Sequence, residues 1–248
     1  GYNSLRNQSA SLMEELASHG YIVVALDHTY VGALTIFPGG RIEYLNPDAL
    51  PSREAVGDEA YFEKAHLIGD VWSADVQYVL GRLETEEMDE RFSGRLDLSR
   101  LGILGHSTGS GVAAILTATD GRFDVGVGMD AWLGPMPQTI QNQGTDKPYL
   151  FLMSELWPTE ENKGFIRTYV NNASQSQYLT IADTAHYDFT EIPLLTPLSG
   201  RIGLSGPINS YRAHELIHTH VLAYFNQTLK AEPTLLFEEA QYPEITIE

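Results

Sequence analysis

Short apolar runs and helical apolar stripes alternate along the chain. Continuous apolar runs, typical of strands buried on both faces of a parallel sheet, predict strands at residues 21–26, 101–104, 125–129, 149–153 and 178–182. Apolar residues at helical spacing predict helices over residues 4–18, 62–87, 112–118, 160–170 and 210–230. This alternation is typical of an α/β fold with a mostly parallel sheet and helices on both faces.

Two stretches interrupt the pattern. Residues 29–60 are rich in Gly and Pro and are expected to form an irregular cap or mouth loop. Residues 233–248 are expected to form an acidic, peripheral C-terminal tail. Ser4 or Asn7 is the expected cap of the first helix. The chain of 248 residues is long enough for one substantial core, which predicts a single domain over residues 1–248.

Composition and charge exclude several classes of function. Lys and Arg number 15 against 33 Asp and Glu, and the net charge of −18 disfavours nucleic acid and anionic membranes as partners. The absence of Cys excludes disulfides, a thiolate metal site and a Cys nucleophile. No apolar run reaches the roughly 18 residues of a membrane span, so no integral membrane segment is expected. Gly1 and Tyr2 open the chain without an initiator Met or a signal-peptide pattern, which predicts an N-terminally incomplete chain whose first strands lie upstream.

The most specific chemical pattern follows the apolar run at residues 101–104. Gly105-His106-Ser107-Thr108-Gly109 has the form Gly-x-Ser-x-Gly, and it stands between a predicted strand and a predicted helix. A serine hydroxyl is a weak nucleophile and must stand clear of the backbone, where a histidine can take its proton. The two glycines remove side chains that would collide in such a tight turn. The pattern therefore predicts Ser107 as the nucleophile of a serine hydrolase.

Partners for this serine are expected at the carboxyl ends of the later strands, where sites of parallel α/β sheets lie. Asp130, Glu155 and Asp183 each follow a predicted strand, and His186 follows the last of them. A hydrolase of this type needs the chain order serine, acid, histidine. His186 lies on a loop and is preferred as the base over the histidines of the final predicted helix. Residue order alone favours Asp130 as the acid and leaves Glu155 and Asp183 open.

The remaining parts of such a site are an oxyanion hole and an acyl pocket. Two backbone N–H groups are needed to stabilise the developing negative charge. One is expected from Thr108, just after the nucleophile, and the other from Tyr2, in the loop before the first helix. Trp132, Trp157 and Phe189 are candidates for an apolar acyl pocket, although aromatic residues near strand ends more often belong to the core.

Several of these segments together resemble one family, the platelet-activating factor acetylhydrolases (lipoprotein-associated phospholipase A2) of the α/β-hydrolase superfamily, with their bacterial relatives. Residues 16–23 resemble its helix and strand before the nucleophile, and residues 105–109 resemble its nucleophile turn. Asp130-Ala131-Trp132 is similar to the family's Asp-Ala-Trp, which carries the acid. Residues 148–155 and 185–190 resemble the next strand and the histidine loop. The resemblance covers roughly residues 1–230 and identifies the chain as a bacterial-type member.

The resemblance implies that Asp130 is the acid, and it supports Tyr2 as an oxyanion donor. It further implies a serine esterase that works through an acyl-enzyme, without calcium or any cofactor, on a short-acyl, phospholipid-like or other small ester. A general carboxylesterase of the polyester or dienelactone hydrolase type is the alternative, because bacterial relatives share the triad. Thr108, where many members have Phe or Met, and residues 29–60 depart from the family pattern.

Two readings from other classes remain. His214-Glu215-x-x-His218 is a His-Glu-x-x-His sequence on a predicted helix, the pattern of a zinc metalloprotease. The third ligand that zinc needs is missing from the expected place, so a structural helix with solvent-facing histidines and no metal is preferred. A hydrolase-like scaffold without catalysis is the other reading, and nothing in the sequence favours it because all three triad positions are filled.

Overall fold

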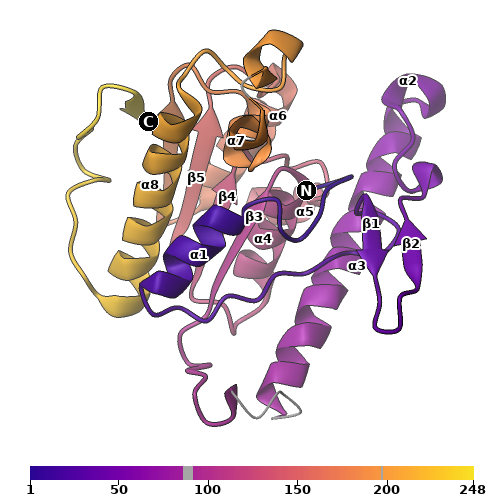
Figure 1. Ribbon diagram of the computed structural model, residues 1–248, viewed down its shortest axis with the longest axis horizontal. Coiled ribbons are helices and arrows are strands. Elements are labelled where there is room, and N and C mark those ends of the chain that lie inside the picture. The colour runs from indigo at the N-terminus through magenta and orange to yellow at the C-terminus, as the bar shows by residue number, and fades with distance from the viewer. Residues whose placement is uncertain (86–91, 197) are drawn as a thin grey trace.

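The central feature is a sheet of five strands in the order β3-β4-β5-β6-β7 (Figure 1). The structure is a computed structural model that describes residues 1–85, 92–196 and 198–248, and this count refers to those residues. The strands are β3 (Gly102–His106), β4 (Val125–Met129), β5 (Tyr149–Ser154), β6 (Ser176–Ile181) and β7 (Ile245–Ile247). β3 to β6 run parallel, and β7 joins β6 in the antiparallel sense.

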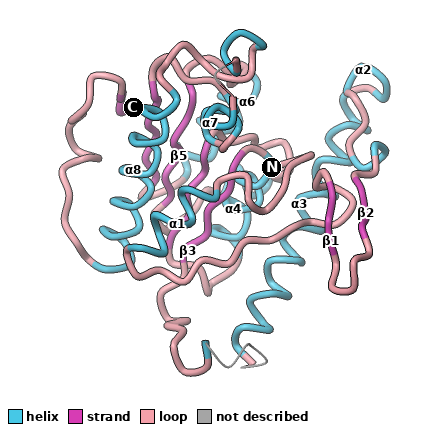
Figure 2. The backbone as a smooth tube through the Cα atoms, in the orientation of Figure 1, coloured by secondary structure: helices cyan, strands magenta, loops and turns pink. Residues whose placement is uncertain are grey.

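Helices connect and cover these strands (Figure 2). The α-helices are α1 (Ala10–Ser18), α2 (Arg53–Val56), α3 (Asp58–Glu84), α4 (Thr108–Thr119), α5 (Gln138–Gln143), α6 (Glu160–Asn172), α7 (Ile192–Leu195) and α8 (Ser210–Lys230). Short 3₁₀ helices are η1 (Pro47–Ala49), η3 (His186–Phe189) and η4 (Ser199–Ile202). A separate hairpin consists of β1 (Leu34–Ile36) and β2 (Ile42–Tyr44).

Helices cover both faces of the sheet, as the apolar pattern predicts. Successive side chains of a strand point to opposite faces. In β5, Leu150 and Leu152 pack in the same cluster as residues of α1 and α8, whereas Tyr149, Phe151 and Met153 pack with residues of α4 and α6. All five side chains are fully buried. A strand covered on both faces reads as a continuous apolar run, and this is the physical reason that the runs are visible in the sequence.

A further layer lies over α4. Ile68, Trp72 and Leu80 of α3 pack against Val112 and Leu116 of α4, so α4 is covered by the sheet on one side and by α3 on the other. Nine of its residues are buried, and its sequence is correspondingly apolar on all sides. The helix that follows Ser107 is therefore held from two sides.

The predicted strand at residues 21–26 is absent. Tyr21 and Val23 pack against the core, but Ile22 and Val24 are 45 % and 46 % exposed. A strand requires a hydrogen-bonding neighbour, and none of the described strands pairs with this segment. The apolar run therefore forms an extended segment with one inward face.

The other differences concern residues that sequence patterns describe as irregular. Residues 29–60 contain the hairpin β1–β2, η1, α2 and the start of α3, because Gly39 and Gly40 supply the positive φ that a tight hairpin connection requires. The tail at residues 233–248 ends in β7, which pairs with β6 and covers its edge. The helix predicted over residues 4–18 begins only at Ala10, after Ser9 as the N-cap. Residues 86 and 87 of another predicted helix lie outside the described residues.

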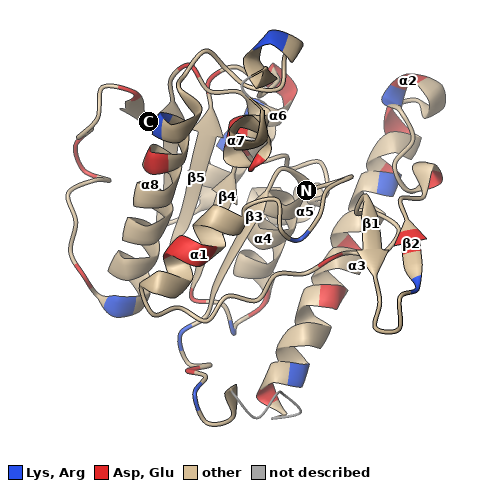
Figure 3. Cartoon of the chain, viewed as in Figure 1, with Lys and Arg blue, Asp and Glu red and all other residues tan. Residues whose placement is uncertain are grey.

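Charged side chains are dispersed over the surface (Figure 3). Lys and Arg lie among the more numerous Asp and Glu on α2, α3 and the connecting loops. Within the described residues, no helix is both long enough and apolar enough to cross a membrane.

One ion pair at the end of α4 gives a pH-dependent stability prediction. The buried Asp120 carboxylate accepts hydrogen bonds from Arg122 at 2.6 and 2.9 Å and from Gln77 at 3.1 Å. The Arg122 guanidinium holds the pKa of Asp120 well below its usual range. A lowered pKa in the folded state stabilises the protein above the ordinary value of 3.8, and this contribution is lost as the pH falls through the folded-state value. Asp120→Asn is therefore expected to lower the free energy of unfolding by about 1–2 kcal/mol at pH 7.

Urea unfolding of both proteins at pH 7 and below pH 3.8 checks this, with Asp70→Asn on the exposed side of α3 as the control. The difference between wild type and Asp120→Asn is expected to shrink at the lower pH. A difference that does not change with pH would show that the carboxylate charge is not the cause.

Candidate active site

Ser107 occupies a strained turn between β3 and α4. Its φ and ψ are 57° and −122°, in a region that residues other than glycine rarely adopt. Its N–H donates to the Met129 carbonyl at 3.0 Å, which ties the turn to the end of β4. A Cβ on Gly105 would collide with the backbone of Gly109, so the close approach of β3 and α4 requires glycine there. The strand, turn and helix expected around Ser107 are all present.

Asp130 and His186 meet at the carboxyl ends of β4 and β6. His186 Nδ1 lies 2.6 Å from Asp130 Oδ2. The other oxygen of Asp130 accepts hydrogen bonds from the backbone N–H of Ser154 at 2.9 Å and from its hydroxyl at 2.8 Å. A carboxylate only accepts hydrogen bonds, so the contact requires the tautomer that carries the proton on Nδ1 and leaves Nε2 as an acceptor. This tautomer can take a proton from a hydroxyl.

The other two candidate acids are engaged elsewhere. Glu155 Oε2 accepts a hydrogen bond from the backbone N–H of Asp183 at 2.8 Å, at an exposed position. Among the described residues, the ion pair of His186 is with Asp130, which is fully buried. The two carboxylates therefore join the loops after β5 and β6, and the structure brings Asp130 to the histidine.

His106 supports His186 from inside the protein. Its Nε2–H donates to the backbone carbonyl of His186 at 3.1 Å, and its Nδ1 accepts from the side-chain amide of Gln8 at 3.1 Å. Burial, together with the nearby His186, lowers the pKa of His106 well below its ordinary value. A neutral ring with one donor and one acceptor satisfies both contacts. Sequence reasoning missed His106, Gln8 and Ser154, because nothing in their local patterns distinguishes them from other polar residues.

The two expected oxyanion donors lie near the nucleophile along the backbone. Thr108 is the first residue of α4, where helix N–H groups have no partner within the helix. Gly1 lies against the turn, since a Cβ built on it would stand 3.3 Å from the Cβ of Ser107. Tyr2 follows directly and donates its hydroxyl to the Leu50 carbonyl at 3.4 Å.

The three aromatic pocket candidates have different surroundings. The half-buried Trp132 donates its backbone N–H to the Ser107 carbonyl at 3.2 Å, and its ring lies 6.0 Å from that of Tyr61. Trp157 stacks on the imidazole of His186. Phe189 is 2 % exposed and packs in the main core. Trp132 therefore lies beside the nucleophile, Trp157 beside the base, and Phe189 in the interior.

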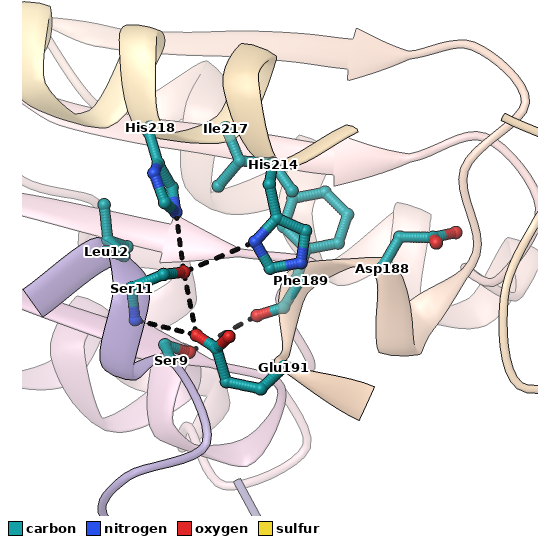
Figure 4. Close-up of a pocket in the computed structure, with 9 residues that line it drawn as sticks. All are labelled: Ser9, Ser11, Leu12, Asp188, Phe189, Glu191, His214, Ile217 and His218. Carbon is teal, nitrogen blue, oxygen red and sulfur yellow. Dashed lines mark hydrogen bonds between the residues drawn. The ribbon is translucent and has the colours of Figure 1, made fainter. Parts of the chain in front are cut away.

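The histidines of α8 face inward, and the expectation that they face solvent is wrong. His214 is 8 % exposed and donates or accepts through Nδ1 to Ser11 Oγ at 3.4 Å, while its Nε2 contacts the Thr190 carbonyl at 3.0 Å. His218 Nε2 lies 3.2 Å from the same hydroxyl, which donates to Glu191 at 2.8 Å (Figure 4). They are buried because α8 packs its apolar stripe onto the sheet and onto α1.

This polar cluster surrounds a cavity of about 10 Å³, which is small for anything beyond a single water. Glu215, the base of the zinc-protease reading, points away and pairs with Arg212 at 3.0 Å. In the part of the chain that the structure describes, no group of three His, Cys, Asp or Glu is arranged to hold a metal ion.

Comparisons with known proteins agree with this architecture. The family model described as "Platelet-activating factor acetylhydrolase, isoform II" matches residues 73–235. A platelet-activating factor acetylhydrolase of Cavia porcellus is 23 % identical over 92 % of this chain and 56 % of its own length, and that of Gallus gallus is 27 % identical over 92 % and 60 %. A probable 1-alkyl-2-acetylglycerophosphocholine esterase of Arthroderma benhamiae is 24 % identical over 99 % and 63 %.

Among solved structures, a ferulic acid esterase from Streptomyces cinnamoneus matches with a TM-score of 0.79 and 25 % identity, over 100 % of this chain and 71 % of that protein. The chain spans slightly more than half the length of the Cavia porcellus relative. The sheet, the helices on both faces and this match agree on an α/β-hydrolase fold.

Proposed function

Since the chain belongs to the platelet-activating factor acetylhydrolase isoform II family, we propose that it is a serine esterase with Ser107, His186 and Asp130 as its catalytic triad. The observation that carries the proposal is the 2.6 Å contact between His186 Nδ1 and the buried Asp130, at the sheet edge where Ser107 stands in its strained turn. Histidine, carboxylate and serine with this order and placement are the parts that acyl transfer needs.

In the proposed reaction, Ser107 Oγ attacks the ester carbonyl carbon while His186 Nε2 takes the hydroxyl proton. Asp130 holds the imidazole in the required tautomer and stabilises the imidazolium that forms. The backbone N–H groups of Thr108 and Tyr2 stabilise the oxyanion of the tetrahedral intermediate. The C–O bond of the ester then breaks, and His186 gives its proton to the leaving alcohol. A water molecule, activated in turn by His186, hydrolyses the acyl-enzyme and regenerates Ser107.

The proposed substrate is a short-acyl, phospholipid-like ester. The names of the vertebrate and fungal relatives, which describe acetylhydrolases and an acetylglycerophosphocholine esterase, support this choice. The alternative, a more general carboxylesterase, is supported by the ferulic acid esterase with the same fold. A hydrophobic pocket discriminates acyl chains by roughly tenfold or more per methylene when it is closely fitted.

A panel of esters tests the proposal. Purified protein is expected to hydrolyse p-nitrophenyl acetate and an acetylated ether phospholipid, with kcat/KM at least about tenfold higher for acetyl than for octanoyl esters, because the pocket admits short acyl groups. Turnover is expected to be the same with and without excess chelator, since no step of the triad mechanism uses a metal. The measurements are initial rates over graded acyl length, with and without EDTA.

Two results would redirect this assignment. A methyl ferulate rate above that of the acetylated phospholipid would favour the general carboxylesterase. Loss of activity to chelator, together with one zinc per chain by elemental analysis, would favour the metal reading of α8.

A further inference from the structure

The loop that follows β5 contacts both members of the His186–Asp130 pair. Ser154, at its start, donates two hydrogen bonds to Asp130, and Trp157, at its end, covers the imidazole of His186. We propose that Trp157 is a positioning residue that holds the His186 imidazole in its working orientation and stabilises its protonated form. This proposal rests on the proposed esterase function and adds a role for a residue that the triad mechanism leaves out.

The first step of the argument is the geometry of the stack. The ring centroids of Trp157 and His186 are 3.9 Å apart and the rings are inclined by only 18°. The Asp130 contact restrains the imidazole at Nδ1, within the plane of the ring. The indole face restrains tilting out of that plane, which the hydrogen bond alone leaves free. Together the two contacts determine the direction of Nε2, the atom that takes the serine proton.

The second step concerns charge. His186 is positively charged only after it has taken the proton from the nucleophile. The face of an indole attracts a cation, so a stacked Trp157 stabilises this state more than the neutral ground state. The ring of His106, 4.4 Å from that of His186, adds no competing positive charge, because burial lowers the pKa of His106 and keeps it neutral. The imidazolium therefore meets one anion and one aromatic face.

The third step is how firmly the indole is held. The backbone N–H of Trp157 donates to Ser154 Oγ at 3.3 Å, and that hydroxyl donates to Asp130. The N–H of Leu156 donates to the Thr184 carbonyl at 3.1 Å, two residues before His186. The loop is thus tied to the acid on one side and to the histidine loop on the other. Since these ties fix the indole relative to both, it can act as a rigid support.

Kinetics of two variants separate this role from that of an acyl pocket. Trp157→Leu retains an apolar side chain but removes the aromatic face, and it is expected to lower kcat for p-nitrophenyl acetate about tenfold with KM changed less than about twofold. Trp157→Phe restores a ring and is expected to recover most of the lost kcat. The chain offers a matched control in His28, whose ring stacks on Trp72 at 4.0 Å and 8° outside the site. Trp72→Phe is expected to leave kcat within about twofold of wild type.

A proton spectrum tests the positioning without relying on turnover. The Nδ1–H proton that His186 shares with Asp130 is expected as a far-downfield resonance, because strong hydrogen bonds to carboxylates deshield the proton. We expect this resonance in wild type, Trp157→Phe and Trp72→Phe, its loss in His186→Gln, and its broadening in Trp157→Leu.

The two measurements distinguish failure of this inference from failure of the proposed function. Equal kcat values for the Leu and Phe variants, a raised KM with normal kcat, or a sharp downfield resonance in Trp157→Leu would each overturn the positioning role while leaving an esterase in place. A wild-type protein without ester turnover, but with the resonance behaving as expected, would overturn the esterase proposal and support the positioning of His186 by Trp157.

Discussion

Ser107→Ala is expected to lower kcat for p-nitrophenyl acetate by about 10⁴-fold or more, because the substitution removes the atom that forms the acyl-enzyme. KM is expected to change little, since the hydroxyl contributes mainly to the chemical step. Initial rates at saturating ester, together with circular dichroism to verify folding, measure the effect. Ser18→Ala, at an exposed position of α1, is the control.

The strained backbone at Ser107 gives this prediction a second readout. A side chain at φ 57° and ψ −122° costs about 1–3 kcal/mol, and glycine adopts such a conformation more easily. Ser107→Gly is therefore expected to be as inactive as Ser107→Ala but at least as stable as wild type in thermal unfolding. Substantial residual turnover in either variant would show that another residue is the nucleophile, and a clear loss of stability in Ser107→Gly would show that the turn stores no strain.

Asp130→Asn is expected to lower kcat/KM by about 10⁴-fold. The amide of an asparagine would donate to His186 Nδ1, which forces the proton onto Nε2 and leaves no base for the serine hydroxyl. The stability of the variant is measured in parallel, because Asp130 is fully buried and accepts two hydrogen bonds from Ser154.

Glu155→Gln is the matched control for the acid. Its amide oxygen retains an acceptor for the Asp183 N–H, so kcat/KM is expected to stay within about twofold of wild type. If Asp130→Asn retained activity while Glu155→Gln lost it, the assignment of the acid would be wrong.

Much of the fold was predictable from periodicity. The strands at residues 125–129 and 149–154 and the helix at residues 210–230 match the expected ranges to within a residue, because each is long or fully buried and so carries a continuous local pattern. β7 and the β1–β2 hairpin were not predictable in this way. Each depends on a partner strand or on a glycine turn rather than on an apolar pattern of its own.

The functional assignments divide in the same manner. The Gly-x-Ser-x-Gly turn is local, so its context was visible in the sequence. The acid was not, because Asp130, Glu155 and Asp183 all follow strands and their order alone leaves more than one candidate. The His-Glu-x-x-His sequence of α8 is the opposite case, a clear local motif whose two histidines converge on Ser11 and whose Glu215 pairs with Arg212.

The sequence by itself therefore determined the alternation of strands and helices, the class of fold and the turn that exposes Ser107, since each depends on residues that are close together in the chain. Only the tertiary structure decided which carboxylate reaches His186, that Trp157 covers its ring, and that His106 holds its backbone. Those partners are 56 and 80 residues from His186 in the cases of Asp130 and His106. Contacts over such separations depend on the order of strands in the sheet and on the loops at their ends, and no local pattern records them.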